Sequence, residues 1–267
     1  MARCNTCESY FILDPPDKED LGKFYPRSAG VYNDAYGTRR RIVSSINGLV
    51  CGHRCIYDDI PRMLPREGHS FALDVGAGAG LLSTLLSSIG WSVLSSDSSS
   101  YALESLKKNE LRCIRSNAEL PPFRDEAFDL VIMSQVIEHL YAPRESLVKY
   151  FRTLKHGGII VIGTPNGASL SHALFGPYWT ESSVPRHLTI FSSRRLRALL
   201  GEVGFSHVTI STTFHPSFGR SLWDASHRSD SGSHTLRDLL AAGLLPLDML
   251  SKMLGRGNGL VATAVKS

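Results

Sequence analysis

Short apolar runs alternate with longer amphipathic segments across residues 70–165. Each run holds four to seven residues, and most are rich in Val, Ile, Leu and Phe, which is typical of buried strands. This order predicts an α/β fold, an open parallel sheet joined by right-handed crossovers. Ligands of such sheets lie outside the carboxyl ends of the strands. We expect strands at 71–75, 91–96, 112–115, 128–134 and 159–163, and helices at 81–89, 101–109 and 145–154.

The flanking segments are less regular. Gly90 is expected to cap the first helix, and Gly157-Gly158 to end the third. A last strand is predicted at 260–265. We divide the chain into a lead-in with a helical cap and a main domain that carries an insert. The ranges are 1–69 for the lead-in, 70–267 for the main domain and 167–193 for the insert. A helix is expected within the lead-in because apolar residues recur there at three- and four-residue spacing, at Ile42, Ile46, Leu49 and Val50.

The segment 236–254 is apolar on more than one face. We expect it to pack against the sheet domain. A dimer contact, or a lip around an apolar substrate, is the alternative.

Composition narrows the class of protein. The chain has 267 residues, 42% of them hydrophobic, and a formal charge of +4, which excludes wholesale disorder and disfavours nucleic-acid binding. Five cysteines are an odd number, so we expect no disulfide framework and a cytoplasmic, reducing setting. The longest apolar stretch, 239–250, contains Pro246 and Asp248 and is too short to span a bilayer. No secretory signal is expected at the start of this sequence.

A glycine-rich turn follows the first predicted strand. Glycines at 76, 78 and 80 permit positive φ and a close approach of the backbone to a ligand. The next helix would offer its unpaired N–H groups to an electron-rich ligand. The dinucleotide fingerprint would need glycine where this chain has Leu81, so the spacing departs from that of nicotinamide enzymes. A tight turn without a ligand is the alternative.

An acidic residue closes the second predicted strand. Asp97 lies 97 − 74 = 23 residues after Asp74. A carboxylate at this place accepts hydrogen bonds from the ribose hydroxyls of a nucleoside. The alternative is a cap for the helix that begins near Ser100.

Together these motifs resemble class I S-adenosylmethionine-dependent methyltransferases, and most closely the branch with ubiquinone-biosynthesis-like O-methyltransferases. The resemblance covers 70–210 well and 4–44 weakly. It implies a Rossmann-like α/β sheet of seven strands with helices on both faces, a helical N-terminal lead-in and an inserted cap. The segments that carry it are 73–80, Asp97, 117–121, 128–131, 135–140, 154–158, 163–166, 185–192 and 204–205.

The resemblance also implies a cofactor, S-adenosyl-L-methionine, and the residues around it. Relatives often have Asp where this chain has Asn117, whose side-chain oxygen can still accept a hydrogen bond from the adenine amino group. Tyr36 would cover the cofactor. The other residues implied are Asp74, Gly76, Ala77 and Gly78 for the methionine part, Asp97 for the ribose, Ser98, Ala118 and Glu119 for the base, and Ser134 and Gln135 beneath the methionine arm.

Methyl transfer to a hydroxyl is helped by a base, and histidine is the usual one. His139 and His187 are the two candidates by position in the motifs. The alternative for His139 is a packing role at a helix start. Tyr178 and Trp179 in the insert are expected either to enclose an apolar acceptor or to tie the insert to the sheet.

Cys4 and Cys7 have the spacing of half a zinc ribbon, but a structural zinc site needs four ligands, so no metal is expected. The expected activity is transfer of a methyl group to an oxygen of a small molecule, with nitrogen or carbon as the alternative acceptor atoms and a homodimer as an open possibility. The alternatives are a nucleoside-binding module without catalysis and a nicotinamide-dependent oxidoreductase.

Overall fold

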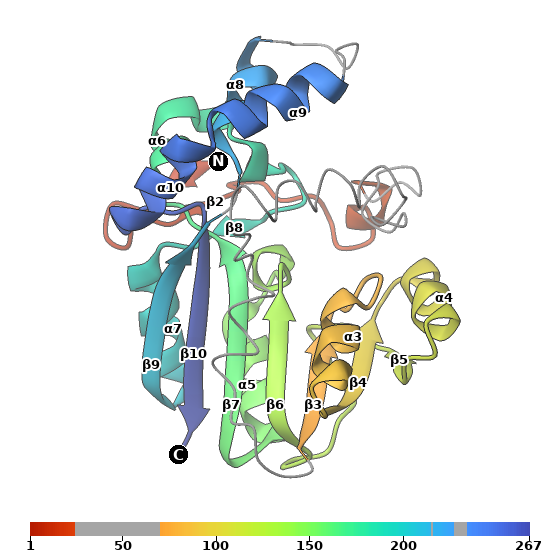
Figure 1. Cartoon of the computed structure of the whole chain (residues 1–267). Helices are drawn as coiled ribbons and strands as arrows, with labels where there is room; N and C mark the ends of the chain where they lie inside the picture. The colour runs from red at the N-terminus through yellow and green to blue at the C-terminus, as the bar shows by residue number, and fades with distance from the viewer. Residues whose placement is uncertain (25–69, 215, 227–233) are drawn as a thin grey trace.

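The computed structural model describes residues 1–24, 70–214, 216–226 and 234–267. Seven strands form one sheet in the order β5-β4-β3-β6-β7-β10-β9 (Figure 1). The predicted seven-stranded α/β sheet is therefore confirmed. Its strands are β3 (Phe71–Val75), β4 (Ser92–Asp97), β5 (Cys113–Arg115), β6 (Phe128–Ser134), β7 (Leu154–Pro165), β9 (Phe205–Thr213) and β10 (Gly259–Lys266).

Strand order reverses between β3 and β6. The chain runs from β3 outward to β4 and β5, and then returns to β6 on the other side of β3. These strands and β7 are all parallel, whereas β10 is antiparallel to both of its neighbours. The carboxyl ends of β3 and β6 therefore flank the point where ligands of open α/β sheets bind.

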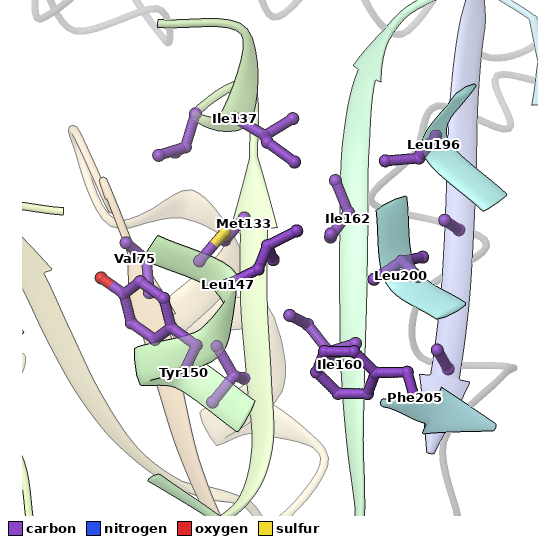
Figure 2. Close-up of a cluster of buried hydrophobic side chains, with 14 of the residues drawn as sticks. Val75, Met133, Ile137, Leu147, Tyr150, Ile160, Ile162, Leu196, Leu200 and Phe205 are labelled. Carbon is purple, nitrogen blue, oxygen red and sulfur yellow. The ribbon is translucent and has the colours of Figure 1, made fainter. Parts of the chain in front are cut away.

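Helices cover both faces of the sheet because successive strand residues point to opposite sides. On one face, Ala72, Leu130 and Ile132 meet Leu82 and Leu86 of α3 (Leu81–Ser88). On the other face, α5 (Pro143–Thr153) and α7 (Ser193–Val203) pack over β6 and β7, as Figure 2 shows for Leu147, Tyr150, Leu196 and Leu200. The helix α4 (Ser100–Lys108) follows β4.

One predicted boundary is wrong. Gly157-Gly158 does not end the helix before it, because α5 stops at Thr153 and both glycines lie inside β7. The register between β6 and β7 shifts after Phe128. Gly157 has φ +74°, so the irregularity uses a conformation that glycine adopts without strain.

A cap covers the edge where the parallel strands end (Figure 1). The two-residue strands β1 (Ala2–Arg3) and β2 (Tyr10–Phe11) form a small antiparallel sheet with β8 (Thr189–Ile190). The cap thus combines the lead-in with the predicted insert. Its short helices are η1 (Leu21–Phe24), η2 (Ile137–His139), α6 (Leu170–Phe175), η3 (Gly176–Tyr178) and η4 (Thr180–Ser182).

Three further helices belong to this cap. They are α8 (Phe218–Ser226), α9 (His234–Gly243) and α10 (Leu245–Met253). The segment 236–254 packs mainly against α8 and α6, which belong to the main domain, 70–267. No helix in the described parts of the chain is long and apolar enough to cross a membrane. The helical pattern at 37–69 and Tyr36 lie outside the described residues.

Candidate functional site

The glycine loop joins β3 to α3. Gly76, Gly78 and Gly80 have φ of +66°, +54° and +84°, so each uses the left-handed region that favours glycine. A Cβ on Gly76 would lie 2.6 Å from Cγ2 of Val136, whereas a Cβ on Gly78 would meet nothing within 4 Å. The N–H of Ala77 donates to the carbonyl of Ser96 at 3.0 Å. The loop is thus held against β4 and the end of β6, and its middle glycine faces open space.

Asp97 ties the end of β4 to this loop. Its carboxylate accepts from the N–H of Gly78 at 3.0 Å and from the N–H of Ser99 at 2.8 Å. Burial raises the pKa of Asp97, and those N–H groups oppose the rise. A carboxylate has about four acceptor sites, so Asp97 can still accept from a hydroxyl group. Ser98 is exposed beside it.

Asp74 lies beneath the loop. Its side chain is 2% exposed and accepts a hydrogen bond from the Ser83 hydroxyl at 2.6 Å. Burial raises the pKa of Asp74 to about 7. The structure therefore gives Asp74 a bracing role under α3, and contact with the cofactor remains a proposal.

The loop after β5 carries the residues predicted to surround the base. Asn117 is exposed, and its side-chain oxygen accepts from the N–H of Glu119 at 2.8 Å. The carbonyl of Glu119 accepts from the Lys149 ammonium at 2.6 Å, and its carboxylate accepts from the N–H of Tyr141 at 2.6 Å. Both backbone polar groups of Glu119 are engaged, so Glu119 braces the loop. A backbone contact to a base is then left to Ala118.

The end of β6 carries two features typical of a ligand site. The hydroxyl of Ser134 is buried and finds no hydrogen-bond partner among the described residues. Gln135 is exposed and has φ +58°, which is strained for a residue with a side chain, while its N–H donates to Gly163 at 2.8 Å. Buried polar atoms rarely lack a partner, so Ser134 fits a site completed by a cofactor.

The two predicted bases lie together. The rings of His139 and His187 are T-shaped with centroids 4.7 Å apart. Nδ1 of His139 is 2.8 Å from the carbonyl oxygen of Arg186, and Nδ1 of His187 is 2.7 Å from that of Glu181. Because a carbonyl only accepts, each neutral ring carries its hydrogen on Nδ1 and its lone pair on Nε2. Burial lowers the pKa of both rings, that of His187 to about 3.

Glu138 is the third member of this cluster, and no sequence prediction named it. Its side chain is fully buried, and one oxygen, Oε2, accepts from the Thr164 hydroxyl at 2.9 Å. The other oxygen, Oε1, has no hydrogen-bond partner among the described residues. Burial raises the pKa of Glu138 to about 8. The available signal was an acidic residue inside an apolar run directly after a strand.

The aromatic residues of the insert take different positions. Trp179 is 2% exposed, stacks on the ring of His172 and donates from Nε1 to the Ser217 hydroxyl at 3.0 Å. Trp179 thus packs on α6 inside the insert and reaches the residue before α8, whereas the alternative expected it to tie the insert to the sheet. Tyr178 is 40% exposed, so its role toward an acceptor stays a prediction.

Cys4 and Cys7 occupy the turn between β1 and β2 as free thiols. Within the described ranges, the one group of three metal-ligating side chains is Glu138, His139 and His187, and it does not include these cysteines. Among residues 1–24, 70–214, 216–226 and 234–267, no group of three metal-ligating side chains includes Cys4 or Cys7.

Comparison with known proteins agrees with this geometry. A family profile described as "Methyltransferase domain" matches residues 73–162. A "probable S-adenosylmethionine-dependent methyltransferase" of Mycobacterium tuberculosis is 26% identical over 165 residues, or 61% of this chain and 57% of that protein. A ubiquinone biosynthesis O-methyltransferase of Cereibacter sphaeroides is 29% identical over 136 residues, or 48% of this chain and 55% of that protein.

A solved structure shares the fold. Phosphoethanolamine N-methyltransferase 2 of Haemonchus contortus superposes with a TM-score of 0.59 at 19% identity, covering 92% of this chain and 60% of that one. The chain spans a little over half the length of the two curated relatives. The matched segment begins in β3 and ends in β7, and so contains the glycine loop, Asp97 and the carboxyl end of β6. Residues 73–162 therefore match a methyltransferase domain, in a chain that is similar to S-adenosylmethionine-dependent methyltransferases.

Proposed function

We propose that this chain transfers the methyl group of S-adenosylmethionine to an oxygen atom of a small molecule. The observation that carries the proposal is the cluster of Glu138, His139 and His187 at the first turn after β6. An acceptor hydroxyl must lose a proton as it attacks, whereas a neutral amine attacks without prior deprotonation. Two neutral imidazoles that can accept a proton, next to the proposed cofactor site, therefore favour oxygen.

His139 is the better placed of the two predicted bases. It lies in η2, directly after β6, and is partly exposed, whereas His187 is 6% exposed behind it. The carbonyl of Arg186 orients the His139 ring through Nδ1. The name of the Cereibacter sphaeroides relative, an O-methyltransferase, supports the same acceptor atom.

The cofactor would be held by the residues around the glycine loop. Asp97 would accept from the ribose hydroxyls, and the open space at Gly78 would admit the methionine part. Ser134 would supply its unpartnered hydroxyl to the same part. The sulfonium is already activated, so the main task of the protein is to hold an acceptor in line with the methyl carbon.

The test is a panel of matched hydroxyl and amine acceptors with labelled S-adenosylmethionine. We expect label transfer to hydroxyl compounds, and a roughly 10²–10⁴-fold lower single-turnover rate in His139→Ala with cofactor affinity retained. His156→Ala is the control, because His156 is 72% exposed on the surface and faces Glu126. Transfer to amines alone, or a full rate in His139→Ala, would contradict the proposal.

Location and assembly are also proposals. The described cysteines, Cys4, Cys7 and Cys113, are free thiols, which supports the reducing cytoplasm. Exposed Leu239 and Leu250 on α9 and α10 support a homodimer. Light scattering of the purified chain tests the dimer.

A further inference from the structure

We propose that Glu138, His139 and His187 form a binding site for a divalent transition-metal cation. Each residue offers one ligand atom, and the three atoms lie within 4.8 Å of one another. One carboxylate and two imidazoles are a donor set that binds zinc, manganese, cobalt or ferrous iron, with positions left open for other ligands.

Each imidazole is already oriented as a metal ligand requires. Metal-binding histidines almost always donate their second ring N–H to a carbonyl or a carboxylate. His139 and His187 both place Nδ1 at hydrogen-bond distance from a backbone carbonyl, 2.8 and 2.7 Å away. The lone pair of each neutral ring is therefore on Nε2.

The carboxylate supplies an independent observation. Glu138 is 0% exposed, and the Thr164 hydroxyl holds Oε2 at 2.9 Å. Oε1 is buried and has no hydrogen-bond partner among the described residues. An unpartnered buried carboxylate oxygen is costly, and coordination to a cation would satisfy it. A hydrogen bond to the second oxygen is the usual support for a ligating carboxylate.

With a cation bound, Nε2 of His139 would be a ligand and not the base, so the cation would take over activation of the acceptor, a consequence that rests on the proposed function. The acceptor hydroxyl would fill an open position, and its pKa would fall. Its proton would pass to solvent, the oxygen would bond to the methyl carbon, and the electron pair of the broken C–S bond would stay on sulfur. The binding of the cation itself does not depend on this step.

Titration of the chelator-treated chain, residues 1–267, with Co²⁺ tests the site without any acceptor. We expect one equivalent to bind with visible d–d absorption, and Zn²⁺ to displace it. Glu138→Gln and His187→Gln should each weaken the affinity at least about 10-fold, because each removes a ligand. His156→Ala should not change it, since His156 and Glu126 form an exposed pair 3.4 Å apart. The Tm and the S-adenosylhomocysteine affinity of each variant check that it is folded.

Two outcomes would overturn the site. One is the absence of saturable Co²⁺ binding in the folded wild-type chain. The other is binding that both ligand variants retain but Cys4→Ser/Cys7→Ser abolishes, which would move the cation to the cysteine turn. The proposed function fails separately: a metal-bound chain that methylates only amines would contradict it and leave the site intact. If the chelator-treated chain methylates hydroxyl acceptors at the full rate, the cation has no part in catalysis.

Discussion

Gly76 and Val136 lie so close that no side chain fits between them. A Cβ on Gly76 would come 2.6 Å from Cγ2 of Val136, and Gly76 has φ +66°. The contact joins the loop after β3 to the segment after β6 across the point where strand order reverses. The two halves of the proposed cofactor site are therefore packed directly against each other.

This contact predicts that Gly76→Ala destabilises the protein by more than Gly78→Ala. Both substitutions place a side chain at positive φ, which costs about 1–2 kcal/mol, but only the first adds a collision. Val136→Ala in the Gly76→Ala background should recover part of the difference. Unfolding followed by denaturant titration measures all three variants. If Gly76→Ala and Gly78→Ala lower the free energy of unfolding equally, the steric account is contradicted.

Asp74 predicts a pH dependence of stability. Its pKa is raised in the folded state from 3.8 to about 7 by burial, so the folded chain binds a proton that the unfolded chain lacks between these values. The contribution to stability is complete below pH 3.8 and is lost as the pH rises to about 7. At about 1.4 kcal/mol per pKa unit, the loss is on the order of a few kcal/mol.

Asp74→Asn removes the titrating group and keeps its shape. As the pH rises from 4 to 7.5, the free energy of unfolding of the wild type should therefore fall relative to that of the variant. Chemical denaturation at several pH values measures it. A difference that is independent of pH would show that Asp74 does not hold a proton in the folded chain.

The contacts of Trp179 predict that its replacement lowers the stability of the fold rather than the rate of methyl transfer. Its removal loses the stack on His172 and the hydrogen bond to Ser217, so Trp179→Ala should cost about 3–5 kcal/mol. Trp179→Phe should cost less because an aromatic ring remains. Tyr178→Ala, at a residue 40% exposed, should stay within about 1 kcal/mol of wild type. If Trp179→Ala has wild-type stability but a raised KM for the acceptor, Trp179 lines the acceptor pocket and the structural account is wrong.

Local patterns explain why the sheet was predictable. The strand predicted at 128–134 matches β6 residue for residue, and the glycine loop and Asp97 fall at strand ends as expected. These features depend on short continuous apolar runs and on glycine at positive φ, which neighbouring residues determine.

The cap was less predictable because its contacts join distant segments. β2 and β8 pair Tyr10 with Ile190, and strands of two residues carry no periodic signal. Glu138 was missed for a related reason. Its importance comes from Thr164 and His187, which the fold brings to it from other elements.

The central claim is that the carboxyl ends of β3, β4 and β6 bind S-adenosylmethionine, with Asp97 holding the ribose. Calorimetric titration of the purified chain with S-adenosylhomocysteine tests it most directly. The account predicts one binding site that needs no added metal, and an affinity lower by about 1–3 kcal/mol in Asp97→Ala. Asp125→Ala, which removes an exposed partner of Arg152, should bind as the wild type does. Absence of binding, or unchanged affinity in a folded Asp97→Ala variant, would contradict the account.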